Sequence, residues 1–131
     1  MPDKDNPPAP APAAIGPYSP GRWAGDFLFL SGRLGLDPVS GQLVGPGVAD
    51  QAAQAMRNLE AGLRQEGLGW AQVVKTTVFL TNMDDFAELN QVYAGFFTGC
   101  PALPARSCVQ VAALPRAGGC VEIEAVAYLL A

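Results

Sequence analysis

The sequence contains no histidine, the side chain that proteins use most often as a general base at neutral pH and as a metal ligand. Serine–histidine triads and histidine metal sites are therefore excluded. Charged residues make up only 15% of the chain, and 8 Lys+Arg against 12 Asp+Glu give a formal net charge of −4. Because binding to a phosphate backbone depends on clustered cations, this balance disfavours non-specific binding to nucleic acids.

Cysteines are few: Cys100, Cys108 and Cys120 form no Cys-x-x-Cys pair. An odd number of cysteines is not typical of a secreted disulfide framework, so we expect a reducing compartment. No apolar run approaches the roughly 18 to 20 residues that span a bilayer, and residues 1–5 lack the charged-then-apolar layout of a signal peptide. We therefore expect a cytoplasmic protein without a membrane partner.

Glycine-rich phosphate-binding motifs are also absent, since neither G-x-G-x-x-G nor G-x-x-x-x-G-K-[ST] occurs, and the sequence does not support nucleotide binding of these types. The chain has 131 residues, of which 50% are hydrophobic, enough for one domain with its own core. Seven of the 12 prolines lie in the first twenty residues. We predict a disordered tail rich in proline and alanine over residues 1–14 and a single domain over residues 15–131.

Apolar periodicity divides this domain into strands and two helices. Phe27–Ser31 predicts a strand, and Asp37–Gly41 predicts a turn with strands on both sides. A helix is predicted over residues 50–66, because Ala52, Met56, Leu59 and Leu63 fall on one helical face. The remaining predictions are a strand over Val73–Leu80, a helix that begins after Asn82, and strands over residues 105–112 and 120–130.

The resulting order is strand, strand, helix, strand, helix, strand, strand, which indicates an α+β domain with a mixed sheet. Two helices cover only one face of such a sheet. The other face still carries bulky side chains, so we expect a second copy of the chain to bury it in a homo-oligomer.

Polar residues alternate along the last two predicted strands. Arg106, Cys108 and Gln110 share one face of the first strand, because strand side chains alternate with period two. Glu122 and Glu124 share a face of the second strand in the same way. If the two strands form an antiparallel hairpin, these rows lie opposite each other. The pattern then predicts one patch with a guanidinium, a thiol, an amide and two carboxylates.

This patch has two interpretations. In the first, Arg106 and the glutamates form salt bridges on a solvated face, as surface charges commonly do. In the second, a partly buried Arg106 binds a planar anion such as a substrate carboxylate. Cys108 is expected to be a small buried thiol, because no histidine is present to activate it as a nucleophile. Asn90 lies among apolar positions of the second helix, so it either bonds a neighbouring loop or belongs to a site.

Several segments, taken in order, resemble the Rid family, the reactive intermediate deaminases. They are Ile15–Ser19, Phe29–Gly32, Val73–Thr81 and Pro104–Val111, and Glu122–Ala125 completes the signature. The resemblance runs from about residue 15 to residue 128 with the family's spacing. Arg106, followed two residues later by Cys108, makes the chain most similar to the RidA branch.

The resemblance implies a chorismate mutase-like α+β fold that assembles as a homotrimer, with sites in the clefts between subunits. It also implies hydrolysis of 2-aminoacrylate, 2-iminopropanoate and 2-iminobutanoate to 2-oxo acids and ammonia, with no cofactor and no metal. Arg106 would bind the substrate carboxylate, and Glu122 would position or deprotonate the attacking water. The other substrate-binding residues that the resemblance implies are Tyr18, Ser31, Asn90 and Cys108.

Arg33 departs from the commonest family pattern, because many relatives have glutamine after the Ser31–Gly32 pair. We expect this additional cation near the cleft to change the substrate range. An alternative function is a non-enzymatic trimer that binds small carboxylates or acts as a chaperone. Ribonuclease and translation-inhibitor roles have also been assigned within the family, but the lack of histidine and the negative net charge disfavour them for this chain.

Overall fold

The computed structural model describes residues 13–129, which form one five-stranded sheet and two α-helices. The strands are β1 (Gly21–Ala24), β2 (Phe27–Leu34), β3 (Val73–Leu80), β4 (Ala105–Gln110) and β5 (Val121–Tyr128). The helices are α1 (Val48–Gln65) and α2 (Phe86–Phe96), and the 3₁₀ turns η1 (Trp70–Gln72) and η2 (Met83–Asp85) precede β3 and α2. The predicted tail, residues 1–14, lies outside the described residues except for Ala13 and Ala14.

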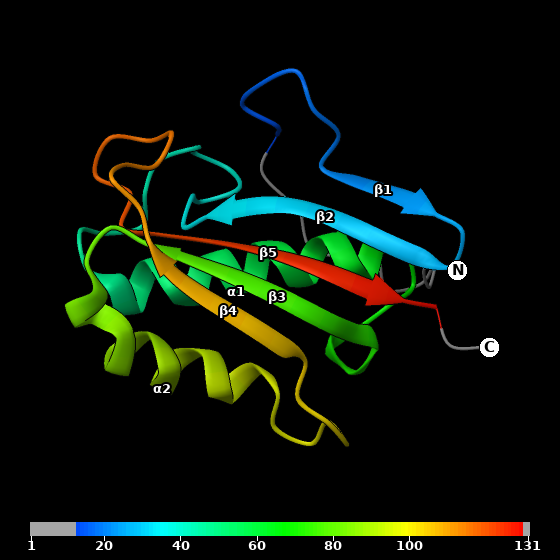
Figure 1. Cartoon of the computed structure of the whole chain (residues 1–131). Helices are drawn as coiled ribbons and strands as arrows, with labels where there is room; N and C mark the ends of the chain where they lie inside the picture. The colour runs from blue at the N-terminus through cyan, green and yellow to red at the C-terminus, as the bar shows by residue number, and fades with distance from the viewer. Residues whose placement is uncertain (1–12, 130–131) are drawn as a thin grey trace.

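The sheet is mixed, with the strand order β1-β2-β5-β3-β4. β3 and β4 run parallel, whereas all other neighbouring strands are antiparallel. Figure 1 shows the strands in front of α1, with α2 beneath the edge strand β4 in this view. The predicted α+β domain, a mixed sheet with two helices on one face, is therefore confirmed.

Helix α1 forms because one of its faces is apolar. Ala52, Met56, Leu59 and Leu63 are all fully buried in the core, as the spacing of these residues predicts. Each large side chain buried in this way contributes about 1.5 to 3 kcal/mol relative to an exposed one. The helix ends before Gly67, whose positive φ of 76° lets the backbone reverse and Leu68 donate its N–H to the Leu63 carbonyl.

Helix α2 follows a capped 3₁₀ turn. The Oδ1 atom of Asn82 accepts a hydrogen bond of 2.9 Å from the backbone N–H of Asp84, as an N-cap residue does. Leu89 and Tyr93 are buried beneath the helix, and Phe97 is buried directly after it. Phe86 stays 38% exposed at the start of α2.

The segment around the predicted turn at Asp37 differs from the prediction on its C-terminal side. The turn itself is present, because Asp37 Oδ1 accepts hydrogen bonds from the N–H groups of Val39 and Ser40. No second strand follows it, and an isolated bridge between Leu36 and Leu43 is the only pairing there among the described residues. Residues 45–47 read Gly-Pro-Gly, which favours a loop because proline lacks an N–H and glycine has no side chain to pack. The additional strand is β1, which precedes β2.

The predicted hairpin of the last two strands is wrong. β3 lies between β4 and β5, so that Val78 pairs with Cys108 on one side and with Ile123 on the other. β5 therefore takes an interior position, where its alternate residues Val121, Ile123, Ala125 and Ala127 are all buried in the core. An interior position buries more of this apolar row than a hairpin at the sheet edge would, which accounts for the topology.

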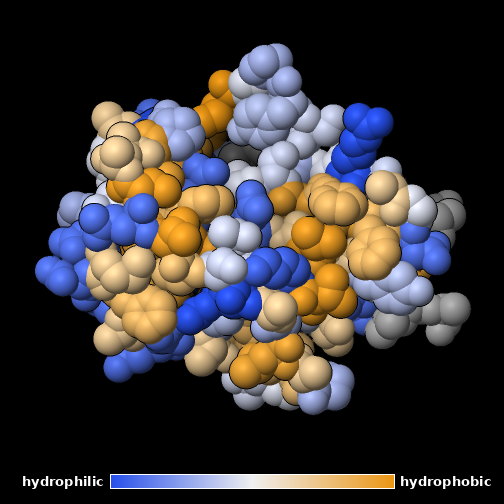
Figure 2. Space-filling view, in the orientation of Figure 1, coloured by the Kyte–Doolittle hydropathy of each residue, from blue (hydrophilic) through white to orange (hydrophobic). Residues whose placement is uncertain are grey.

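The sheet face opposite the helices retains exposed apolar side chains. Phe27 and Phe29 are 42% and 49% exposed, and Val109 is exposed to a similar extent. Figure 2, drawn in the orientation of Figure 1, shows hydrophobic surface on both sides of a polar band across this face. Within residues 13–129, no helix is both long enough and apolar enough to cross a membrane.

Candidate functional site

Arg106 lies on β4 with its guanidinium against aromatic rings of α2. The guanidinium carbon lies 4.9 Å from the ring centre of Tyr93 and 5.5 Å from that of Phe86. The Tyr93 hydroxyl is 2.7 Å from Thr76 Oγ1, and Thr76 pairs with Arg106 across the parallel strands. Burial raises the pKa of Tyr93, against the opposing effects of Thr76 and Arg106, so this ring stays a neutral phenol. The rings thus support the cation by cation–π contacts.

No carboxylate of the described residues neutralises Arg106, because the one salt bridge within residues 13–129 joins Arg64 and Glu60. The interpretation of Arg106 and the glutamates as surface salt bridges therefore finds no support. A guanidinium held by aromatic faces keeps its N–H donors available in the plane of the group. Arg106 is in this way arranged to receive an anion.

Asn90 lies between Phe86 and Tyr93 along α2, four residues after the first and three before the second. These spacings place all three side chains on the side of the helix that faces Arg106. The Oδ1 atom of Asn90 is buried and has no hydrogen-bond partner among the described residues. Asn90 was predicted either to bond a neighbouring loop or to belong to a site. Among the described residues its Oδ1 atom makes no bond to a loop, so the prediction of a site residue remains.

Cys108 follows Arg106 on the same face of β4 and is partly buried. Burial raises the pKa of its thiol, although the positive charge of Arg106 acts in the opposite direction. A thiol with a raised pKa is a poor nucleophile at neutral pH. The prediction was a small buried thiol, and the structure shows a thiol that is partly buried against the core.

A second group of predicted site residues gathers at an irregularity of β2. The register of β2 against β5 shifts between Leu30 and Arg33, which marks a β-bulge at Ser31 and Gly32. The Ser31 hydroxyl donates a hydrogen bond of 2.7 Å to the Ser19 carbonyl. A groove on the open face is lined by Pro17, Tyr18, Ser19, Arg22, Phe29, Leu30, Ser31, Glu124, Ala125 and Val126. Tyr18 and Ser31 therefore lie side by side, as the sequence predicts.

Glu122 on β5 lies next to the bulge, because a Cβ atom added to Gly32 would collide with its carboxylate. Only glycine at position 32 leaves room for this side chain. Burial, and to a lesser extent the negative charge of Glu124, raises the pKa of Glu122. A half-buried carboxylate with a raised pKa is suited to take a proton from water and to return it.

The two groups lie on opposite faces of the sheet, which corrects the prediction of one shared patch. Arg106 and Cys108 pair with Thr76 and Val78, whose side chains are buried on the helix side, whereas Glu122 faces the open side. β3 separates β4 from β5, so about 10 Å of sheet also lies between the two rows. Gln110, predicted in the patch, instead accepts a hydrogen bond from the N–H of Met83 and fixes η2.

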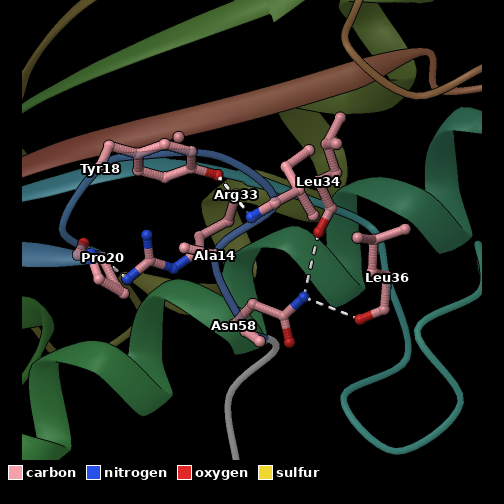
Figure 3. A pocket seen from close by; sticks show the side chains of 10 residues that line it. Ala14, Tyr18, Pro20, Arg33, Leu34, Leu36 and Asn58 are labelled. Atoms are coloured by element: carbon pink, nitrogen blue, oxygen red, sulfur yellow. Dashed lines mark hydrogen bonds between the residues drawn. The ribbon is translucent and has the colours of Figure 1, made fainter.

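Sequence reasoning missed two features of this arrangement. Tyr93 and Phe86 were not predicted as site residues, although their spacing around Asn90 signals a shared face. Arg33 was expected near the cleft as a free cation, but it is buried and donates to backbone carbonyls beside a small pocket, which Figure 3 shows. Within residues 13–129, no cluster of three or more Cys, Asp or Glu residues is arranged to hold a metal ion.

The fold and these side chains define a small α+β protein with a guanidinium, that of Arg106, on one sheet face and a half-buried carboxylate, that of Glu122, on the other. A family model described as Endoribonuclease L-PSP matches residues 8–129. The chain is 52% identical to the 2-iminobutanoate/2-iminopropanoate deaminase of Mus musculus, an alignment that covers 89% of this chain and 84% of the relative.

Two solved structures extend the comparison. The structure of Escherichia coli TdcF with bound serine is 41% identical, has a TM-score of 0.86, and is matched over 92% of this chain and 94% of that one. A member of the conserved Rid protein family from Yersinia pestis is also 41% identical, with a TM-score of 0.86 over 91% of this chain and 93% of that one. The chain belongs to the Rid family.

Proposed function

We propose that the protein hydrolyses 2-aminoacrylate, 2-iminopropanoate and 2-iminobutanoate to 2-oxo acids and ammonia. The observation that carries this proposal is Arg106, a guanidinium supported by two aromatic rings and paired with no described carboxylate. Every substrate of this class has a carboxylate next to the carbon that water attacks. The mouse relative is named for two of these imines, and the structure of TdcF contains serine, which has a carboxylate in the same position relative to nitrogen.

Arg106 binds the carboxylate of the imine through two parallel charge-assisted hydrogen bonds. Asn90, whose buried Oδ1 atom lacks a partner among the described residues, accepts a hydrogen bond from the imine nitrogen. This bond recovers the roughly 1 to 3 kcal/mol that an unpaired buried acceptor costs. Cys108 lies on the same side of the site as Arg106, and its thiol stays neutral because burial raises its pKa.

Water attacks the carbon of an imine, so 2-aminoacrylate reacts after it tautomerises to 2-iminopropanoate, in which its methylene carbon gains a proton and its nitrogen loses one. Glu122 acts on this water. Its carboxylate takes one proton as the water oxygen bonds to the imine carbon, and the electron pair of the C=N bond moves to nitrogen. Glu122 then returns the proton to nitrogen, which gives a carbinolamine. Glu122 next carries the hydroxyl proton of this carbinolamine to nitrogen, the C–N bond breaks, and ammonia leaves as the C=O bond of the 2-oxo acid forms. Tyr18 and Ser31, which line the groove beside Glu122, orient the substrate on this side.

The two groups meet only if different subunits supply them, because within one chain the sheet lies between Arg106 and Glu122. We therefore place the site between neighbouring subunits of a homotrimer. The exposed side chains of Phe29 and Val109 on the open face supply apolar surface for this contact. Each trimer would then contain three equivalent sites.

The experiment generates 2-iminobutanoate in situ with a threonine dehydratase and traps surviving imine with semicarbazide. The samples are wild type, Arg106→Ala, Glu122→Gln and a protein-free control, because imines hydrolyse spontaneously in water. Arg57→Ala serves as the matched control, since Arg57 is exposed on α1 and bonds only to Gln54 among the described residues.

Wild type and Arg57→Ala should form 2-oxobutanoate faster than trapping removes the imine, whereas Arg106→Ala and Glu122→Gln should not. Equal rates in all samples would contradict the deaminase function. If wild type then still binds 2-oxobutanoate and Arg106→Ala does not, the alternative of a non-enzymatic carboxylate-binding trimer would hold instead.

A further inference from the structure

Arg33 is an arginine buried between β2 and α1, with only 8% of its surface exposed. One of its terminal nitrogens would lie 3.1 Å from a Cβ atom at Gly62, so the side chain packs closely on the helix. Burial lowers the pKa of this guanidinium, and the neighbouring Tyr18 partly opposes that effect. A buried cation is costly unless its donors are satisfied, and no described carboxylate pairs with Arg33.

Two backbone carbonyls satisfy this guanidinium instead. One end donates a hydrogen bond of 2.6 Å to the Ser31 carbonyl, and the other end donates one of 3.0 Å to the Pro20 carbonyl. Figure 3 shows the Arg33 side chain directed at Pro20 and lying beside Tyr18. The rigid fork of arginine is suited to join two acceptors on separate segments.

The same two segments are joined by two further bonds. The N–H of Ser31 donates to the Pro20 carbonyl at 3.0 Å, and the Ser31 hydroxyl donates to the Ser19 carbonyl at 2.7 Å. Three hydrogen bonds therefore connect the segment before β1 to β2, and the fourth, from Arg33 to the Ser31 carbonyl, lies within β2 and braces its bulge. Tyr18 has no comparable attachment of its own, because it is 44% exposed and its hydroxyl accepts only a local bond of 3.3 Å from Ile15.

We propose that Arg33 is a positioning residue, which fixes Tyr18 and Ser31 on the Glu122 side of the active site by fastening the segment through Pro20 to β2. The inference rests on the proposed function. Arg33 acts through the backbone, since the groove that contains Tyr18, Ser31 and Glu124 is not lined by its side chain. Arg33 was expected to change the substrate range as an additional cation near the cleft, whereas the role proposed here acts through the backbone of a neighbouring segment.

The test compares Arg33→Met, which has similar length and no donors, with Arg33→Gln, which keeps donors at one end only. Arg57→Met is the matched control on the exposed side of α1. For each variant, kcat and KM for 2-iminobutanoate and the hydrogen-exchange rate of the Ser31 amide are measured. The exchange rate reports the Pro20–Ser31 connection and requires no activity.

In Arg33→Met, we expect the Ser31 amide to exchange roughly tenfold faster or more, since one of its neighbouring bonds is lost. The value of kcat should fall roughly tenfold to a hundredfold, as expected for misplaced groups, while KM changes less than about twofold because Arg106 is untouched. Arg33→Gln should give intermediate values, and Arg57→Met should match wild type.

Faster exchange with unchanged kcat would overturn the positioning role, and so would an unchanged exchange rate in Arg33→Met. A rise in KM with constant kcat would show that Arg33 acts on substrate binding instead, which also overturns it. If Arg33→Met does not fold, the same criteria apply to Arg33→Gln. Absence of turnover in wild type would contradict the proposed function. The connection that Arg33 makes between Pro20 and β2 is judged separately, because an unchanged Ser31 exchange rate in the variants would overturn it without any activity measurement.

Discussion

Replacing Tyr93 by leucine removes the closer of the two rings that support Arg106, at 4.9 Å from the guanidinium carbon. A cation–π contact contributes about 0.5 to 2 kcal/mol, with the larger values at desolvated sites. If this energy serves to hold Arg106 in place for the carboxylate, its loss weakens substrate binding roughly 2- to 30-fold. Phe86 remains in Tyr93→Leu, so binding is weakened and not abolished.

Tyr93→Phe is the control, because it keeps the ring and removes only the hydrogen bond to Thr76. This variant leaves the buried Thr76 hydroxyl unpaired and should lose about 1 to 3 kcal/mol of the free energy of unfolding, with nearly unchanged KM. The assay measures KM for 2-iminobutanoate and thermal unfolding of both variants. Equal KM values for Tyr93→Leu and Tyr93→Phe would refute the supporting role of the ring.

Three further predictions follow from the site. Burial raises the pKa of Glu122 in the folded protein, so the contribution of Glu122 to the free energy of unfolding should fall as pH rises from the pKa of the unfolded chain through that of the folded one. Urea unfolding of wild type at several pH values should show this fall, and Glu122→Gln should lack it. Gly32→Ala should displace the Glu122 carboxylate and lower kcat roughly tenfold or more in the imine assay, and an unchanged kcat would contradict the contact. Asn90→Leu should raise thermal stability, by up to about 1 to 3 kcal/mol, yet lower activity, and a destabilised variant would show that the amide is already paired.

The helices and the central strand could be predicted because their signals are local. Ala52, Met56, Leu59 and Leu63 repeat with the period of an α-helix, so a helix places all four side chains on one buried face. Val73–Leu80 is rich in β-branched residues, and its bounds as a strand agree with the prediction. Both signals depend on residues within a few positions of one another.

The order of the strands in the sheet could not be predicted in the same way. β4 and β5 are neighbours in sequence, so a hairpin was the natural expectation, yet β3 inserts between them. The alternation along β5 predicts which residues share a face, and it holds for Glu122 and Glu124. It does not predict which strand lies alongside, because that depends on how much apolar surface the whole sheet buries.

The site shows the same division between local and long-range information. Tyr18 and Ser31 come together as predicted, and Arg106 lies beside the helix that contains Asn90. The separation of Arg106 from Glu122 by the sheet follows from strand order alone. Arg33 reads as an available cation in the sequence, and only the fold shows that two carbonyls bind it.

The central claim is that each active site combines Arg106 of one subunit with Glu122 of another, and trimers of mixed composition test it most directly. Arg106→Ala and Glu122→Gln should each be inactive when assembled alone. When the two are co-expressed in equal amounts, random assembly gives about a quarter of the sites both intact residues. The account predicts imine hydrolysis at about that fraction of the wild-type rate. Activity no higher than the mean of the two separate variants would contradict it.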